Sequence, residues 1–204
     1  MRNVRQGVAI NPHYRKFTPV VAEYFMTHGD LTDAVWILET IAASRPNLVA
    51  FWVNLVRGYA QLGQNEKAIQ ALQQWRRLSP NAPGVRAMDI FLLNRTGHRE
   101  QAVQMLRQRF SNKTFDYDLV QVGYRMGLEN HDWPLVIQSL ELGIQSWPEQ
   151  AADGYFKLGK MYAEPEVHDD AKALAAFRAG LQSLPSNQKD NYRRQVPESY
   201  RNRL

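Results

Sequence analysis

The fold is decided by residues 52–80, which read WVNLVRGYAQLGQNEKAIQALQQWRRLSP. Apolar side chains recur here three and four positions apart, as they do along one face of a helix. Gly63 interrupts the pattern and Pro80 ends it, so the stretch predicts two helices joined by a tight turn. We expect Asn47 to cap the first of these helices and Asn65 to cap the second.

The same pattern recurs every 34 residues along the chain. Four columns stay in register: Gly29, Gly63 and Gly97; Ala34, Ala68 and Ala102; Leu38, Leu72 and Leu106; Pro46, Pro80 and Pro148. Trp52 and Leu55 stand where the tetratricopeptide pattern has its first aromatic residue and its leucine. The period therefore predicts an all-α, tetratricopeptide-like right-handed superhelix of about five helical hairpins.

The repeat also sets the expected boundaries. The five repeats run over residues 15–48, 49–82, 83–116, 117–150 and 151–185. We expect the alanine column to mark close approach between helices, with Val136 replacing alanine in the fourth repeat. The fifth repeat has a lengthened turn at residues 163–168. We expect residues 1–14 to form a flank and residues 186–204 a basic capping tail.

Composition excludes several classes of protein. The 204 residues are 44% hydrophobic and contain no cysteine, which excludes disulfides and thiolate metal sites. The net charge of +5 is concentrated at the two ends, where residues 1–16 carry +4 and residues 186–204 carry +3, so the body is slightly acidic. A nucleic-acid-binding protein gathers its basic residues on the folded body, so we expect no nucleic-acid partner. The longest apolar run, residues 48–53, is too short to span a membrane.

The sequence contains no arrangement typical of catalysis. The five histidines are scattered, mostly in expected turns, and show no zinc-binding spacing. Glycine-rich phosphate loops and nucleophile motifs are absent too. We therefore expect no catalytic residue, metal or cofactor in this segment.

The expected concave surface is the candidate binding site, because the first helix of each hairpin lines it. Its cations and amides suit backbone carbonyls or a carboxylate, and its aromatic rings suit an apolar side chain. The candidate groove residues are Asn54, Arg57, Phe91, Arg95, Gln121, Arg125, Phe156 and Lys160. An ordinary solvated inner face is the alternative interpretation.

Several strings go beyond the generic repeat. They are NPHYRK at residues 11–16, FDYDLV at 115–120, WPEQAADG at 147–154, DDAKALAAFR at 169–178 and VPESYRNRL at 196–204. In these strings the chain resembles the carboxy-terminal extracytoplasmic region of bacterial pilin-glycosylating O-oligosaccharyltransferases. These enzymes are relatives of the O-antigen ligases and membrane-bound polysaccharide polymerases. The resemblance covers essentially the whole chain.

The resemblance implies a parent membrane enzyme that transfers a glycan from an undecaprenyl-linked donor to Ser or Thr of exported proteins such as pilin. It implies that the catalytic residues lie outside this segment, and that residues 1–14 link it to a membrane portion. The segment would then be a periplasmic domain, monomeric in isolation, that binds the acceptor protein or its own membrane portion. The basic amino terminus favours the cytoplasmic side instead. A free-standing adaptor that binds a peptide in its concave groove is the alternative function.

Overall fold

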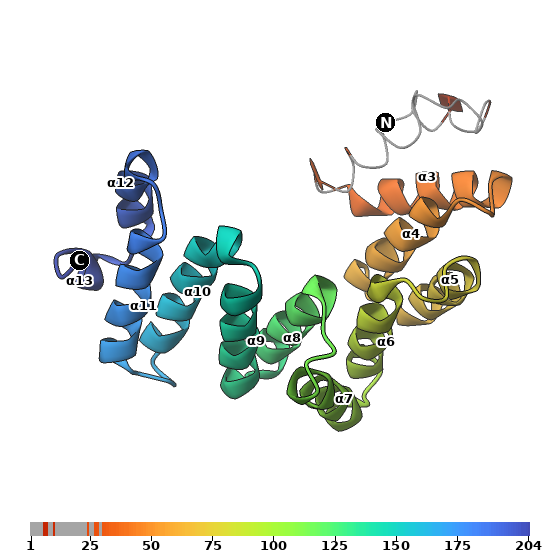
Figure 1. Ribbon diagram of the computed structural model, residues 1–204. Coiled ribbons are helices and arrows are strands. Elements are labelled where there is room, and N and C mark those ends of the chain that lie inside the picture. Colours follow the sequence, from red (N-terminus) through yellow and green to blue (C-terminus); the bar gives the residue numbers. More distant parts are fainter. Residues whose placement is uncertain (1–5, 8–9, 11–23, 25–26, 29) are drawn as a thin grey trace. The chain divides into compact units, whose positions relative to one another are not determined.

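The computed structural model describes residues 6–7, 10, 24, 27–28 and 30–204. Over these residues the chain forms successive helices and no strand, so the expected all-α class is confirmed (Figure 1). Most of the predicted flank at residues 1–14, and most of the first predicted helix, lie outside the described residues.

The chain divides into two compact units, Met1–Arg107 and Gln108–Leu204. The described helices of the first unit are α3 (Leu31–Ser44), α4 (Val49–Gln61), α5 (Asn65–Leu78), α6 (Pro83–Arg95) and most of α7 (Arg99–Ser111). Within it, α4 packs against both α3 and α5, and α5 packs against α6. From α3 to α6, each helix therefore contacts its neighbours in the sequence, as expected of stacked hairpins.

The second unit follows the same plan. Its elements are α8 (Tyr117–Asn130), α9 (Trp133–Ser146), the short 3-10 helix η1 (Pro148–Gln150), α10 (Ala151–Ala163), α11 (Asp170–Gln182), α12 (Ser186–Gln195) and α13 (Glu198–Arg201). Helix α9 packs against α8 and α10, and α10 packs against α11. The predicted lengthened turn lies between α10 and α11, where Trp133 Nε1 of α9 donates to Glu166 Oε2 at 2.7 Å.

The tight turns follow the predicted column, but the helix caps do not. Gly63 and Gly97 adopt φ values of 72° and 92°, and His131, which is in the same column, adopts 54°. Left-handed backbone thus closes these three hairpins at the same position of the repeat. The prediction that Asn47 and Asn65 are caps was wrong: the capping positions are Leu48 and Gln64.

Asn65 instead begins α5, so its side chain is one position too late to reach the first free amides of the helix. Its Nδ2 donates to the backbone oxygen of Arg95, at 3.2 Å. Asn65 therefore ties α5 to the end of α6.

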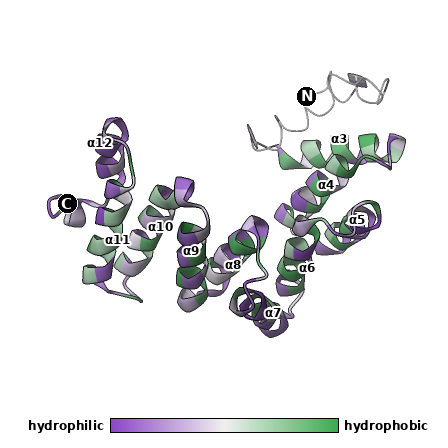
Figure 2. Ribbon diagram, viewed as in Figure 1, coloured by the Kyte–Doolittle hydropathy of each residue, from purple (hydrophilic) through white to green (hydrophobic). Residues whose placement is uncertain are grey.

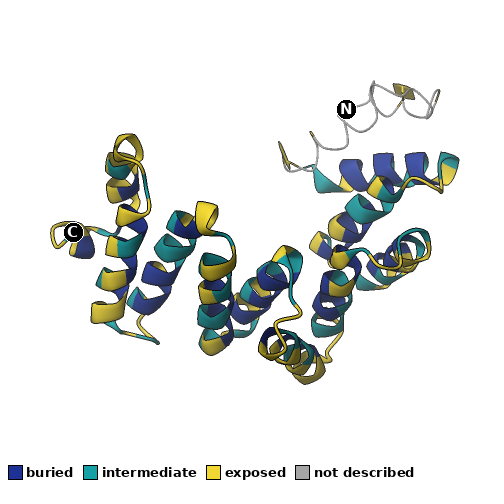
Figure 3. Cartoon of the chain, viewed as in Figure 1, coloured by how far each residue is buried: buried dark blue, intermediate teal, exposed yellow. Residues whose placement is uncertain are grey.

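The alanine column lies fully within the core. Ala34, Ala68, Ala102 and Ala173 are all completely buried, and so is Val136 in the fourth repeat. Buried residues follow one side of each helix and exposed residues the other (Figure 3). Small side chains at these positions allow the helix backbones to approach closely.

The carboxy-terminal residues cover the last hairpin. Helix α12 is almost entirely hydrophilic (Figure 2), yet Tyr192 from α12 and Val196 and Tyr200 beyond it are buried in one cluster with Phe177 of α11. The Tyr200 ring lies 5.5 Å from the Phe177 ring, and its hydroxyl donates to Asp170. The apolar face that α11 would otherwise expose is thus buried by the chain itself.

Candidate functional site

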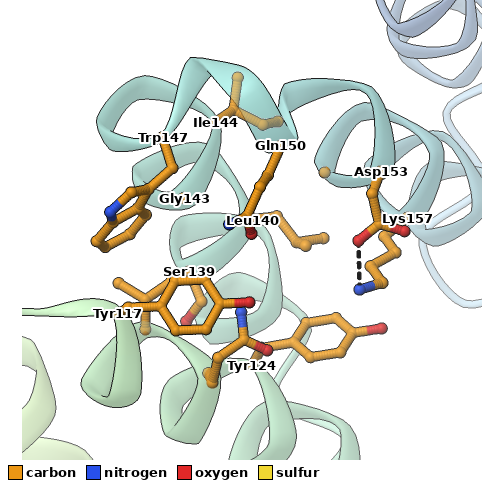
Figure 4. A pocket seen from close by; sticks show the side chains of 13 residues that line it. Tyr117, Tyr124, Ser139, Leu140, Gly143, Ile144, Trp147, Gln150, Asp153 and Lys157 are labelled. Carbon is orange, nitrogen blue, oxygen red and sulfur yellow. Dashed lines mark ion pairs between the residues drawn. The ribbon is translucent and has the colours of Figure 1, made fainter.

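A pocket lies within the second unit, where α8, α9, η1 and α10 meet (Figure 4). Its free volume is about 50 Å³, room for a few water molecules or the tip of one side chain. It is lined by Tyr117, Val120, Gln121, Tyr124, Ser139, Leu140, Gly143, Ile144, Trp147, Gln150, Asp153, Gly154 and Lys157. Aromatic, apolar and polar groups therefore converge on one small cavity.

Helix α8 supplies one wall of this pocket. Tyr117, Gln121 and Tyr124 are four and three residues apart, which places their side chains on one face of the helix. The helix begins at Tyr117 because the Asp116 side chain accepts a hydrogen bond from the Leu119 amide at 3.0 Å. The cap thus fixes the position of Tyr117, the first of these three residues, in the wall of the pocket.

The end of α9 supplies a second aromatic wall. Trp147 follows the last residue of α9 and precedes Pro148, which opens η1. Its ring stands 5.3 Å from the Tyr117 ring, at an interplanar angle of 88°. This edge-to-face contact is the favourable geometry for aromatic pairs and holds the two rings as a corner.

Helix α10 supplies the charged side of the pocket. Lys157 Nζ lies 2.6 Å from Asp153 Oδ2, one turn earlier on α10, and 5.6 Å from the centre of the Tyr124 ring. Burial acts to lower the pKa of Lys157, but the hydrogen bond and charge of Asp153 raise it overall. Lys157 therefore stays protonated, and its charge is balanced by a carboxylate beside it.

Several side chains around this pocket end in polar groups. The hydroxyls of Tyr117 and Tyr124, the indole N–H of Trp147 and the side-chain amides of Gln121 and Gln150 make no hydrogen bond to the residues that the structure describes. Ser139 differs, because its buried hydroxyl donates to Leu135 O within α9 at 2.8 Å. The pocket thus presents several donors and acceptors that only water or a ligand can satisfy.

The candidate groove residues of the first unit do not form one exposed surface. Asn54 is half-buried and Arg57 exposed, both on α4. Phe91 is only 2% exposed, so it is a core residue of α6 and presents no ring to a ligand, contrary to its expected position in the groove. Arg95 donates from Nη2 to Ala60 O at 3.2 Å, which engages it between α6 and α4.

In the second unit, Gln121 alone of the predicted residues lines the α8–α10 pocket. Arg125 is exposed on α8. Phe156 lies on another face of α10, with its ring 5.7 Å from that of Tyr192 in α12, and Lys160 Nζ lies 5.8 Å from the Phe156 ring. Phe156 and Lys160 thus form a separate group beside α12.

Sequence reasoning missed most of the pocket. Tyr117, Tyr124, Gly143, Trp147 and Asp153 were not among the predicted binding residues. The stripe of Tyr117, Gln121 and Tyr124 was readable from helical spacing, but Trp147 and Gly143 come from the second helix of the hairpin. They therefore lie outside the surface that the first helices of the hairpins line.

Within the ranges that the structure describes, no group of His, Asp or Glu side chains is placed to hold a metal ion. Nor does any helix there combine the length and apolarity needed to cross a bilayer.

Comparison with known proteins identifies the fold. No family model matches the chain, and no curated protein matches its sequence. Several solved structures are similar to it, including the following three. PilW, described as a type IV pilus biogenesis factor, shares 14% identity over 93% of this chain and 99% of its own, with a TM-score of 0.56. MamA from Desulfovibrio magneticus RS-1 shares 15% identity over 82% and 93%, with a TM-score of 0.51.

The third is the Cut9–Hcn1 complex of the APC/C, which shares 16% identity over 95% of this chain but only 38% of the matched chain, with a TM-score of 0.59. The fold is therefore all-α and tetratricopeptide-like, as the 34-residue period predicts. At these identities the similarity establishes the fold alone.

Proposed function

We propose that this chain is a protein-interaction module, and that the α8–α10 pocket holds an extended segment of a partner protein. One observation carries the proposal: an aromatic pocket whose polar tips have no partner among the described residues. An extended peptide presents alternating carbonyl and amide groups that can satisfy such tips. Tetratricopeptide-like hairpins support this role, because they hold side chains from several helices in a rigid arrangement.

Lys157 is the residue whose loss tests the proposal most directly. Its ammonium carries three donors, and Asp153 accepts from only one side of it. Lys172 is a matched control: it pairs with Asp169 at 3.0 Å and lies 5.4 Å from the Tyr162 ring, but it is exposed on α11 and lines no part of this pocket. The two lysines thus share their chemistry and differ in location.

The experiment is a selection of random peptides on the full 204-residue chain, followed by calorimetric titration of the selected peptides. Lys157→Ala should weaken binding roughly tenfold, since a hydrogen bond from a charged donor is lost. Lys172→Ala should leave affinity unchanged. Failure to select any peptide, or equal effects of the two substitutions, would overturn the proposal. Binding of maltohexaose in place of peptide, abolished by Lys157→Ala, would reassign the pocket to sugars.

We further propose that the partner is the acceptor protein of a membrane O-oligosaccharyltransferase, of which this chain is the periplasmic domain. The strings FDYDLV at residues 115–120 and WPEQAADG at 147–154 support this, because both carry the family resemblance and both contribute to the pocket. Tyr117 and Val120 come from the first string, and Trp147 and Asp153 from the second. The free-standing adaptor remains the competing proposal.

The reading frame that contains this chain separates the two proposals. Upstream coding sequence with many membrane-spanning apolar stretches supports the transferase, and its absence supports the adaptor. If a parent enzyme exists, Lys157→Ala should lower glycosylation of acceptor pilin in cells, whereas Lys172→Ala should not. Normal glycosylation after deletion of residues 108–204 would overturn the acceptor-binding role.

A further inference from the structure

We propose that the anchor held by the α8–α10 pocket is a small neutral aliphatic side chain, of about the size of valine, and that Gly143 sets this limit. The inference rests on the proposed peptide-binding function and adds the chemistry of the bound residue. It follows from three features of the pocket: an unfilled glycine position, a small free volume and a balanced charge.

Gly143 differs from the other glycines of the second unit, all of which are described. An added Cβ would come within 2.6 Å of a neighbouring side chain at Gly127, Gly154 and Gly159, and closer still at Gly123 and Gly180. Packing thus requires glycine at those five positions. At Gly143 an added Cβ would meet only Val120 Cγ1, at 3.6 Å, which is ordinary contact.

Packing therefore does not explain the glycine at position 143. Within a helix, glycine is less favourable than alanine by about 1 kcal/mol. Gly143 lies inside α9 and lines the pocket, so a side chain there would project into the free volume. The missing side chain keeps the pocket open, and this function accounts for a residue that the helix itself disfavours.

The size of the opening limits what can enter. A cavity of about 150 Å³ lined by apolar side chains holds benzene. The free volume here is about 50 Å³, which suits the methyl groups of a short aliphatic side chain better than an aromatic ring. Val120, Leu140 and Ile144 provide the apolar surface for such a group.

Charge also selects the anchor. Lys157 is balanced by Asp153 at 2.6 Å, so the pocket has no unpaired charge to attract a carboxylate or an ammonium group. The indole N–H of Trp147 and the free N–H groups of Lys157 stand at the same cavity and suit the main-chain carbonyls beside the anchor. A neutral aliphatic residue in an extended segment suits both the balanced charge of the pocket and the N–H donors beside it.

The test changes the size of the pocket by substitution and measures the size of the anchor side chain that the pocket then prefers. A position-scanning library of hexapeptides, titrated against the full chain, should show a preference for valine at one position. Gly143→Ala should weaken the valine-anchored peptides roughly tenfold and shift the preference to alanine or glycine. Val120→Ala, on the facing wall, should shift it toward leucine or isoleucine. Gln145→Ala, on the exposed side of α9, is the matched control and should change nothing.

The outcomes separate the inference from the function on which it rests. Peptides that bind with a charged or aromatic anchor, and that still lose affinity in Lys157→Ala, would overturn the inference and keep the function. An anchor preference that does not move in Gly143→Ala or Val120→Ala would also overturn it. Peptides indifferent to Lys157→Ala would overturn the function itself. Thermal unfolding of each variant confirms that the folded chain is being compared.

Discussion

Two regions of this protein use tyrosine and tryptophan in opposite ways. In the first unit, Tyr59 donates its hydroxyl to Glu39 at 2.6 Å, and Trp52 donates its indole N–H to Pro46 O at 2.7 Å. These aromatic residues connect one part of the unit to another. In the α8–α10 pocket, the polar tips of Tyr117, Tyr124 and Trp147 make no such bond to the described residues.

Residue type alone therefore does not assign the role of an aromatic side chain in this helical array. A polar tip that finds an internal partner contributes to stability, and one that does not is available to a ligand. The two regions should therefore respond differently to the same substitution, with stability affected in the first and binding in the second.

The largest difference is expected when each tyrosine ring is removed. Tyr59 is only 7% exposed, so Tyr59→Ala should lower the free energy of unfolding by about 3 kcal/mol. Tyr124 is half-buried at the pocket, and Tyr124→Ala should cost about 1 kcal/mol but abolish measurable peptide binding. Urea unfolding and calorimetric titration measure the two effects. Equal losses of stability would contradict the distinction.

A finer test removes only the hydroxyl groups. Tyr59→Phe should lower the free energy of unfolding by about 1 kcal/mol, because the hydrogen bond to Glu39 is lost. Tyr124→Phe should leave stability unchanged and weaken peptide binding a few-fold. If Tyr124→Phe destabilises as much as Tyr59→Phe, the Tyr124 hydroxyl has an internal partner and the pocket is not open.

Gly143→Ala should raise the free energy of unfolding although it reduces the free volume of the pocket. The gain should be about 0.5–1 kcal/mol, since alanine favours the helix and meets only Val120. Gly159→Ala is the opposite case, because its Cβ would come within 2.6 Å of the Phe177 ring, and it should lower the melting temperature. A loss of stability in Gly143→Ala would show that packing requires this glycine.

The smallest expected effect is a difference in pH dependence. Burial, reinforced by the hydrogen bond to Glu39, raises the pKa of Tyr59 above its ordinary value of 10.0. The folded state favours the neutral hydroxyl of Tyr59. Its contribution to the free energy of unfolding is therefore complete below the unfolded pKa of 10.0 and is lost as the pH rises through the folded pKa. Between neutral pH and about pH 10.5, the advantage of the wild type over Tyr59→Phe should shrink by a few tenths of a kcal/mol. A constant difference across this range would contradict the pKa shift.

Much of the fold was predictable because the repeat is a local property. Gly63 and Gly97 close hairpins where the 34-residue period places them, and Ala68 and Ala102 are fully buried as the alanine column requires. The glycine column also contains His131 of the fourth repeat, which adopts a left-handed conformation although histidine carries no obvious turn signal. The caps were harder to predict, because a shift of one residue moves a side chain such as that of Asn65 out of reach of the helix amides.

The periodic pattern in the sequence was enough to establish helical hairpins, because burying one face of a helix needs only correctly spaced apolar residues. The site depended on packing between helices, which spacing within one helix does not encode. Phe91 was predicted to line the groove and lies in the core, whereas Trp147 and Gly143 were not among the predicted groove residues and line the pocket. Only the contacts among α8, α9 and α10 decide which aromatic tips are left without partners, because each such tip depends on what the neighbouring helix offers it.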